Sequence, residues 1–353
     1  MKVVKFGGSS LANVENVLKA RDIILADGAR RFVVVSAPGK CAGFPRKITD
    51  LLIDTYAQMC FEETCDSCDV VFDRFAELCD GLGVDMGAEL DRTREEININ
   101  KCQYDFVVSR GEYLMAILMA KVLGWKFLDA AHYIIIKKDG TCDIDATRRN
   151  FLRLGKDGKY VIGGFFGRGE NGIKTFARGG SDYTGSIVAV CMNAEIYENF
   201  TDTYGVQTAN PSVVKNTKTV AEIDYNTLYS LCRGGASVIY PNCIPLLKTH
   251  NMPLQVDCTF DPGKNPTIIT HCKSKKPFFS LTYETRQNIN KDTAEILCVV
   301  HKIKFPLGRL REILIGREVY LVEFCASSFR LLCPVEELKK VLNLLHGELV
   351  RHI

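Results

Sequence analysis

The first part of the chain alternates between short apolar runs and amphipathic stretches. Lys2–Phe6 is a β-prone run, glycines and serines interrupt it at residues 7–10, and Leu11–Ala26 carries apolar residues at helical spacing. Arg31–Ser36 is a nearly continuous apolar run, which is typical of a strand buried on both faces of a parallel sheet. This order of strand, glycine turn, helix and strand predicts a βαβ unit.

The same alternation continues to about residue 270. The expected helices are Glu112–Leu123 and Tyr183–Met192, and the expected strands are Trp125–Leu128, Tyr160–Phe166 and Glu195–Thr201. Alternating strands and helices favour an α/β fold with a mostly parallel central sheet.

The pattern changes after residue 270. The expected elements are then a strand, a helix, a hairpin and an amphipathic helix: Ala294–Val300, Leu307–Ile315, Val319–Ala326 with Phe329–Cys333, and Glu336–Leu349. This β-α-β-β-α order suits a small ferredoxin-like α+β domain. We therefore divide the chain into residues 1–272 and residues 273–353, at a basic stretch that resembles a linker.

Composition and charge exclude several classes of protein. The 353 residues carry 45 Lys and Arg against 42 Asp and Glu, so the net charge of +3 gives no support to nucleic-acid or acidic-membrane partners. No apolar run reaches the roughly 18–20 residues of a membrane span. The N-terminus lacks the long apolar region of a signal peptide. We expect a cytoplasmic protein.

The 15 cysteines support the same location. Their odd number and scattered positions do not indicate a disulfide framework, so we expect buried thiols in a reducing compartment. Cys65 and Cys68 form a lone CxxC without a second pair of metal ligands at zinc-site spacing. Because they share helical spacing with Phe72 and Phe75, we favour a helix face over a metal or redox site.

Three glycine-containing motifs follow or precede expected strands and carry candidate chemistry. At Lys5–Ser10, a lysine and two glycines lead into a helix, which suits either an anion site or a plain glycine turn. At Ala177–Thr184, an arginine beside paired glycines opens a helix, which favours carboxylate binding over capping alone. At Asn199–Gly205, a strand ends in Thr-Asp, either at a ligand-binding sheet edge or in an ordinary turn.

A fourth motif, Gly167–Gly172, fits GxGxxG but is rejected as a dinucleotide fingerprint. That fingerprint requires a helix to open at once in the first βαβ unit. The residues that follow, Ile173–Phe176, are β-prone instead. The motif predicts a hairpin loop.

Taken in order, the motifs of residues 1 to about 270 resemble those of aspartokinases in the amino-acid kinase superfamily. They are KFGGSS (Lys5–Ser10), VVSAPGK (Val34–Lys40) with KITDLL (Lys47–Leu52), SRGE (Ser109–Glu112), GFFG (Gly164–Gly167), ARGGSDYT (Ala177–Thr184) and NFTDxxGVxxANP (Asn199–Pro211). Single motifs occur more widely, but the ordered set is specific. The resemblance implies a three-layer α/β/α kinase domain, and the tail resembles an ACT-type regulatory module.

The resemblance also implies an activity, namely transfer of the γ-phosphoryl group of MgATP to the β-carboxylate of L-aspartate. The product, 4-phospho-L-aspartate, opens lysine, threonine and methionine biosynthesis. The implied catalytic residues are Lys5 and Asp182. The implied substrate-side residues are Ser36, Thr49, Glu112, Arg178, Gly180 and Ser181. The implied nucleotide-side residues are Lys5, Gly7, Gly8, Ser9, Thr201 and Asp202. Mg²⁺ would arrive with the nucleotide, and no separate protein metal site is expected.

The chain departs from the family pattern on the nucleotide side. The usual TDVDG reads Thr201-Asp202-Thr203-Tyr204-Gly205 here, and Gln207 stands where many relatives carry an aromatic residue. Ser212 belongs to an Asn-Pro-Ser that replaces the common Asp-Pro-Arg. Two alternatives therefore stay open, a non-catalytic amino-acid-binding homologue and a kinase for another acidic amino acid.

The tail departs as well, because residues 273–353 have room for about one ACT module where aspartokinases generally carry two. A single module could pair across a homodimer or a larger homo-oligomer. Whether it also binds an effector is left open.

Overall fold

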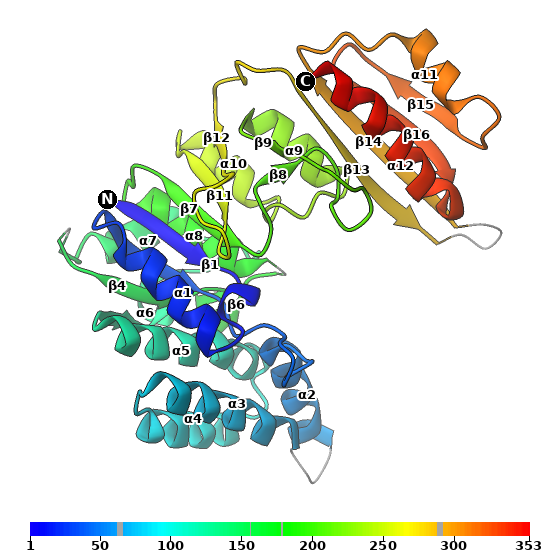
Figure 1. The fold of residues 1–353 in the computed structure, drawn as a ribbon. Coiled ribbons are helices and arrows are strands. Elements are labelled where there is room, and N and C mark those ends of the chain that lie inside the picture. Colours follow the sequence, from blue (N-terminus) through cyan, green and yellow to red (C-terminus); the bar gives the residue numbers. More distant parts are fainter. Residues whose placement is uncertain (62–65, 156, 178, 288–291) are drawn as a thin grey trace. The chain divides into compact units, whose positions relative to one another are not determined.

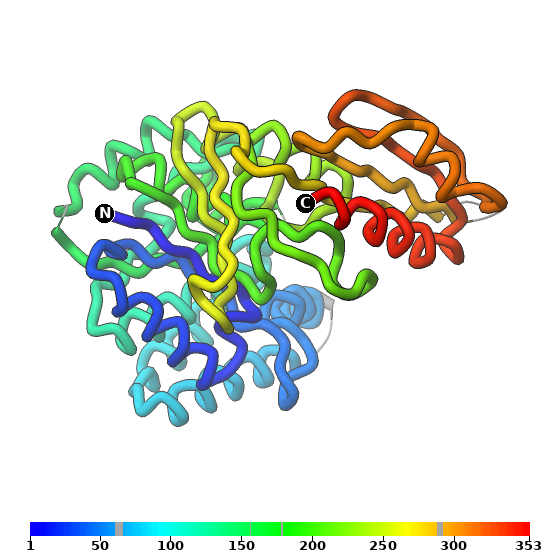
Figure 2. The backbone as a smooth tube through the Cα atoms, turned by 45° about the horizontal axis from the view of Figure 1, so that its top comes forward, coloured from blue at the N-terminus to red at the C-terminus, as the bar shows by residue number. Residues whose placement is uncertain are grey.

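The computed structural model describes residues 1–61, 66–155, 157–177, 179–287 and 292–353 (Figures 1 and 2). The chain divides into two compact units. The first unit comprises Met1–Thr203 and Asp257–Pro262, and the second comprises Tyr204–Val256 and Gly263–Ile353. The functional boundary at residue 272 is a separate division and stays a prediction.

The first unit is built on a parallel sheet. Its strands lie in the order β7 (Tyr197–Thr201), β1 (Lys2–Phe6), β2 (Arg30–Val35), β4 (Tyr160–Gly163) and β3 (Lys126–Leu128). Every pairing in this row is parallel, as the alternating pattern predicts. The two central strands are almost wholly buried, which explains their continuous apolar sequence.

Helices cover both faces of this sheet. One face carries α1 (Val14–Leu25) and α5 (Tyr104–Leu123), and the other carries α7 (Ile144–Phe151) and α8 (Gly180–Cys191) (Figure 1). The expected three-layer α/β/α arrangement is therefore confirmed. Short elements complete these layers: η1 (Ser9–Leu11), α6 (Ala130–Tyr133), β5 (Phe166–Gly169) and β6 (Gly172–Thr175).

A further group of helices packs against α5 on its outer side: α2 (Ile48–Phe61), α3 (Asp66–Leu82) and α4 (Gly87–Ile99). Cys68 is buried on α3 beside Phe72 and Phe75, which confirms the helix-face interpretation for this half of the CxxC. Cys65 lies outside the described residues. Among the described helices, none is both long enough and apolar enough to cross a membrane.

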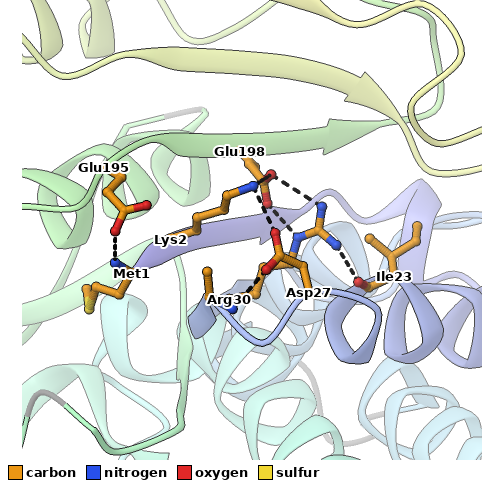
Figure 3. Close-up of polar contacts among 8 residues, drawn as sticks. Met1, Lys2, Ile23, Asp27, Arg30, Glu195 and Glu198 are labelled. Atoms are coloured by element: carbon orange, nitrogen blue, oxygen red, sulfur yellow. Dashed lines mark hydrogen bonds and ion pairs between the residues drawn. The ribbon is translucent and has the colours of Figure 1, made fainter.

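Buried charges join the strands at the amino end of the sheet. Glu198 on β7 is 1% exposed, and its carboxylate accepts from Arg30 Nε at 2.6 Å and from Lys2 Nζ at 3.2 Å (Figure 3). Lys2 Nζ also lies 2.9 Å from Asp27 Oδ2. The paired cations compensate for the desolvation of Glu198, so this cluster is a structural clamp between β7, β1 and β2.

The second unit contains three groups of paired strands. One has the order β10 (Glu222–Asp224), β12 (Thr267–Thr270) and β11 (Leu254–Cys258), with the last two residues of β11 counted in the first unit. Its helices are α9 (Tyr225–Arg233) and α10 (Cys243–Thr249). A small hairpin pairs β8 (Val206–Gln207) with β9 (Thr219–Val220).

The C-terminal sheet is antiparallel. Its order is β13 (Phe278–Arg286), β14 (Thr293–His301), β16 (Ser328–Pro334) and β15 (Tyr320–Phe324). The helices are α11 (Leu307–Leu314) and α12 (Val335–Leu349), followed by η2 (Val350–His352). The predicted β-α-β-β-α order is confirmed in β14-α11-β15-β16-α12, whereas β13 was not anticipated.

Two features distinguish this C-terminal part. The apolar cluster under α12 includes Ala209 and Val214, which precede the sheet by more than sixty residues of chain. In addition, β15 forms one edge of the sheet and all five of its residues are exposed, with Tyr320 at 60% and Val322 at 59%.

Candidate functional site

The candidate site lies where the parallel strands of the first unit end. Phe6 pairs in register with Phe200 and Val35, and Val35 pairs with Gly163, so these strands finish in one row. The next residues, Gly7, Ser36 and Gly164, continue this edge through backbone hydrogen bonds of 2.9–3.2 Å. The carboxyl edge of a parallel sheet is the usual place for a ligand.

Lys5 and Asp182 meet at this edge. Lys5 Nζ lies 2.6 Å from Asp182 Oδ1, and Lys5 is only 7% exposed. Asp182 stands in the first turn of α8, which begins after Gly179 in the left-handed conformation (φ 86°). A buried ammonium needs a negative partner, and Asp182 supplies it. The two residues assigned to catalysis are thus brought together across 177 positions of sequence.

The loop after β1 passes directly over this ion pair. A Cβ atom added to Gly7 would lie 3.5 Å from Lys5 Nζ. Gly8 meets Gly39 closely, since Gly39 N–H donates to Gly8 O at 2.8 Å and a Cβ on Gly8 would stand 2.8 Å from Ala37 O. The glycines therefore allow two backbone segments to meet beside the ammonium, while Ser9 is exposed.

A buried hydroxyl pair holds the other side of this loop. Ser10 Oγ lies 2.6 Å from Thr259 Oγ1, and Thr259 N–H donates to Thr201 O at 2.9 Å. Thr259 therefore contacts both the loop after β1 and the end of β7. Sequence reasoning missed this role, because nothing in the spacing of Ser10 and Thr259 indicates contact over 249 positions.

Glu112 on α5 is a buried carboxylate without a full set of partners. It is 4% exposed, and its Oε2 has no hydrogen-bond partner among the described residues. Burial raises the pKa of Glu112 to about 8, although a hydrogen bond from the Ala37 backbone opposes this shift. A buried oxygen of this kind is satisfied when a ligand brings a donor, and an ammonium group would also supply the compensating charge.

Ser36 and Thr49 stand near the turn of α5 that carries Glu112. Ser36 is half-buried directly after β2, and Thr49 is half-buried in the first turn of α2. The start of α2 packs on α5, because a Cβ on Gly111 would lie 2.8 Å from Ile48 and 2.9 Å from Ala37. The two hydroxyls therefore belong to segments that converge beside Glu112.

Gly180 and Ser181 form the start of α8 and pack on the corner after β4. A Cβ on Gly164 would lie 2.6 Å from the Ser181 side chain, and one on Gly180 would lie 2.9 Å from Phe165. Phe165 itself has a positive φ of 74°, an uncommon conformation for a bulky residue. Arg178, the candidate carboxylate clamp, lies outside the described residues.

Thr201 and Asp202 end β7 at the same edge. Thr201 Oγ1 donates to Asp202 Oδ1 at 3.2 Å, and Asp202 is exposed. The rejected GxGxxG motif lies in the antiparallel hairpin of β5 and β6, which confirms the expected hairpin.

The departures from the family pattern lie in the second unit and bond to their own neighbours. Gln207 Nε2 donates to Tyr204 O at 2.9 Å and to Thr219 Oγ1 at 2.8 Å. Asn210 Oδ1 accepts from the Ser212 backbone and hydroxyl at 3.0 and 2.7 Å. These side chains therefore stabilise the β8–β9 hairpin and the turn that follows β8.

Asn199 is a further residue that sequence reasoning did not assign. It is 1% exposed on β7, its Nδ2 donates to Asp182 Oδ1 at 3.3 Å, and its Oδ1 has no partner among the described residues. A signal was present in the sequence, because Glu198 and Asn199 place two polar residues side by side in an expected strand of the parallel sheet. The clamp explains Glu198, but Asn199 belongs to the site.

Comparisons with known proteins agree with this arrangement. The model of the amino acid kinase family matches residues 1–256. Aspartokinase 3 of Bacillus subtilis is 34% identical over 288 residues, which cover 76% of this chain and 63% of that protein. The aspartokinase of Chlamydia pneumoniae is 28% identical over 330 residues, which cover 88% and 71%. The chain thus spans less than two thirds of the first of these relatives.

Solved structures give the same result. The aspartate kinase of Clostridium acetobutylicum superposes with a TM-score of 0.86 at 25% identity, over 98% of this chain and 99% of that one. Escherichia coli aspartokinase III in complex with aspartate and ADP has a TM-score of 0.82 at 19% identity, over 99% and 100%, and shares the fold. The resemblance to aspartokinases is confirmed, and the chain belongs to the amino acid kinase family.

Proposed function

We propose that this protein is an aspartokinase, a transferase that moves the γ-phosphoryl group of ATP to the β-carboxylate of L-aspartate. The names of its relatives from Bacillus subtilis and Clostridium acetobutylicum, an aspartokinase and an aspartate kinase, support aspartate as the phosphoryl acceptor. The observation that carries the proposal is the meeting of Lys5 and Asp182 beside the glycine loop, on the same sheet edge as the buried Glu112.

The proposed reaction requires neither a general base nor a covalent intermediate on the protein. The bond between the γ-phosphorus and its bridging oxygen breaks, and a bond to an aspartate carboxylate oxygen forms. The attacking carboxylate is already ionised, so no base has to remove a proton. Positioning of the reactants and neutralisation of phosphoryl charge therefore dominate catalysis.

Each side chain then has a defined role. Lys5 neutralises charge on the transferring group, and Asp182 holds its ammonium. The loop of Gly7, Gly8 and Ser9 faces the phosphates, and Thr201 and Asp202 contact the nucleotide. On the substrate side, Glu112 receives the ammonium of aspartate. The other substrate contacts are assigned to Ser36, Thr49, Arg178, Gly180 and Ser181.

Mg²⁺ would enter with the ATP phosphates. Magnesium is usually held by one or two carboxylates together with substrate phosphates, and Asp182 is a carboxylate of this cluster that could supply an oxygen. When bound, the ion would neutralise phosphate charge. The residues of the chain still have to bind and orient both substrates.

A hydroxamate assay tests the proposal. The purified protein is incubated with MgATP, hydroxylamine and either L-aspartate or L-glutamate, and the acyl phosphate is trapped as hydroxamate. We expect signal with aspartate that disappears when ATP or Mg²⁺ is omitted. Signal with glutamate alone would assign a different acidic substrate. Aspartate binding without hydroxamate would identify a non-catalytic amino-acid-binding homologue, for which the altered residue Tyr204 is the best argument.

A further inference from the structure

Asn199 has an environment that packing alone does not explain. Its side chain is buried on β7 of the first unit's sheet, yet one of its two polar atoms has no partner among the described residues. Buried polar atoms in native proteins are nearly always hydrogen-bonded, so each exception needs a reason. A leucine would fill a similar volume without leaving an unpaired oxygen.

Register places Asn199 next to Lys5. The two residues are Cα partners on adjacent parallel strands, so their side chains project from the same face of the sheet. That face carries α8, whose first turn presents Asp182. Glu198, one position earlier, projects from the opposite face into the ion clamp shown in Figure 3.

Lys5 and Asn199 converge on a single oxygen. Asp182 Oδ1 receives Lys5 Nζ at 2.6 Å and Asn199 Nδ2 at 3.3 Å. The orientation of the amide is chemically determined here, because only its NH₂ group can donate to a carboxylate. The Asp182 carboxylate is thus held from β1 by a cation and from β7 by a neutral donor.

We propose that Asn199 is a positioning residue for phosphoryl transfer. By donating to Asp182, it fixes the carboxylate that holds the Lys5 ammonium beneath the glycine loop. The ammonium keeps its place when it turns its remaining N–H groups toward the transferring phosphoryl group. This inference rests on the proposed kinase function and gives a role to Asn199, to which the resemblance assigned none.

The unpaired Oδ1 fits this role. When the Lys5 ammonium turns N–H groups toward a phosphoryl group while it stays beside Asp182, its other N–H groups still need acceptors on the same face of the sheet. Asn199 Oδ1 is an acceptor on the strand directly beside Lys5. An apolar residue would support the fold equally well and would lack this acceptor.

The test compares Asn199→Leu with Asn199→Asp and a matched control, Glu198→Gln. Asn199→Leu removes the donor while keeping a similar volume. Asn199→Asp keeps the shape and places an acceptor opposite the carboxylate. Glu198→Gln alters the neighbouring residue of the same strand on the opposite face. Thermal midpoints establish that each variant is folded, and kcat and the KM for aspartate are measured for each.

We expect kcat to fall roughly tenfold in Asn199→Leu and further in Asn199→Asp, because a displaced reacting group lowers turnover steeply. The KM for aspartate should stay within twofold, and the midpoint of Asn199→Leu should equal or exceed that of the wild type. Glu198→Gln should lose stability while keeping kcat. A purely structural Asn199 would instead lower the midpoint and leave kcat unchanged, which overturns the proposal.

A second readout is independent of activity. Competitive acetylation followed by mass spectrometry gives the reactivity of Lys5 relative to Lys19, whose side chain is exposed on α1. Asn199→Leu removes the hydrogen bond to Asp182 and should raise this reactivity ratio at least threefold. Glu198→Gln keeps that hydrogen bond and should leave the ratio unchanged. An unchanged ratio in Asn199→Leu contradicts the inference. If the wild type makes no hydroxamate, the kinase proposal fails by itself, and the acetylation ratio still decides whether Asn199 holds the Lys5–Asp182 pair.

Discussion

Single residues set the electrostatics of the site. Lys5 and Glu112 are both buried, but Lys5 has a charged partner at 2.6 Å whereas Glu112 has an oxygen without one among the described residues. A buried charge with a partner keeps its charged form without a ligand. A buried acid without a partner gains stabilisation of its charged form when a ligand of opposite charge binds. The two residues should therefore respond differently to substitution and to pH.

Lys5→Ala should lower kcat by roughly 10²–10³, the usual cost of removing one donor that stabilises transition-state charge. Steady-state kinetics with a coupled ADP assay measures this change. The KM for aspartate should change little, because Glu112 and the hydroxyl groups of Ser36 and Thr49 on the substrate side are unchanged. Turnover close to that of the wild type would remove Lys5 from the mechanism.

Glu112 should make aspartate binding depend on pH. Its pKa of about 8 leaves the carboxyl mostly neutral at pH 6.5 in the free protein, and a neutral acid cannot pair with the substrate ammonium. The KM for aspartate should therefore fall as pH rises from 6.5 to 8.5. In Glu112→Gln the KM should be high throughout, with this pH dependence lost. A wild-type KM that is flat across the range would contradict this assignment.

Glu112 should lower folding stability at neutral pH although it promotes aspartate binding. The pKa of the carboxyl is raised from its ordinary 4.5 by burial, so above pH 4.5 the unfolded chain releases a proton that the folded protein retains. Folding stability therefore falls as pH rises from 4.5 to 8. Glu112→Gln should remove this slope in thermal unfolding scans and raise the midpoint at pH 7.5, although it binds aspartate poorly. A lower midpoint for Glu112→Gln would show that other groups of the folded protein already stabilise the charged carboxylate of Glu112.

Whole elements are positioned by close backbone contacts. The N-terminus of α8 carries Gly180, Ser181 and Asp182, and it rests against Gly164 at the end of β4. No side chain fits between Gly164 and Ser181, so the position of the helix depends on one missing Cβ atom.

Gly164→Ala should therefore shift the start of α8 and lower kcat at least tenfold, because Asp182 moves relative to Lys5. Gly28→Ala is the matched control, since a Cβ there meets nothing within 4 Å. Steady-state kinetics and circular dichroism should show two folded proteins of which only Gly28→Ala is fully active. Equal activity would mean that the α8 start tolerates displacement.

The C-terminal elements hold the segment around β8. Thr208 Oγ1 lies 2.9 Å from His346 Nε2 on α12, and its backbone carbonyl accepts from Leu281 on β13 at 2.8 Å. Ala209 and Val214 enter the apolar cluster under α12. The segment around and after β8 is therefore packed against the C-terminal sheet and α12.

His346 should make this packing sensitive to acid. Burial, assisted by the positive charge of Lys218, lowers the pKa of His346 below its usual 6.5. Its contribution to stability is thus present above pH 6.5 and is lost as pH falls below that value, because the unfolded chain binds the proton first. Urea midpoints should drop between pH 7.5 and 5.0, and His346→Gln should show a smaller drop. An identical drop in both proteins would assign the acid sensitivity elsewhere.

At the scale of the whole molecule, we propose self-association through the C-terminal sheet. The edge strand β15 is exposed along its whole length and offers unpaired backbone groups as well as Tyr320 and Val322. Sedimentation velocity should show a homodimer or larger homo-oligomer that dissociates in Val322→Lys. Glu318→Lys, outside the strand, serves as the control. A monomeric wild type would refute this use of the edge.

Much of this fold was predictable because its patterns are local. The glycine motifs, the parallel sheet and the β-α-β-β-α order depend on neighbouring residues and were found from sequence. The start of α5 was not predicted from sequence. Residues Val107–Ala120 are all buried, and a fully buried helix has no polar face that would reveal its helical period. The strand Tyr160–Phe166 was predicted too long, because Phe165 breaks it with a positive φ.

The candidate site divides in the same way. Lys5, Glu112 and Asp182 stand in motifs with recognisable residue types, so their selection needed no coordinates. Asn199 and the pair Ser10–Thr259 act through contacts between distant segments, and their partners are visible only in the three-dimensional arrangement.

The buried cysteines have a practical consequence for chemical labelling. Burial raises the pKa of Cys79 to about 11 and that of Cys142 and Cys191 to about 12, so these thiols resist alkylation at neutral pH. Among the described residues, the exposed thiols are Cys60, Cys102, Cys272 and Cys325. A hydrogen bond to Glu323 raises the pKa of Cys325, which should react more slowly than the other exposed thiols. Brief treatment with a maleimide dye should therefore mark each compact unit at defined surface positions while the protein stays folded.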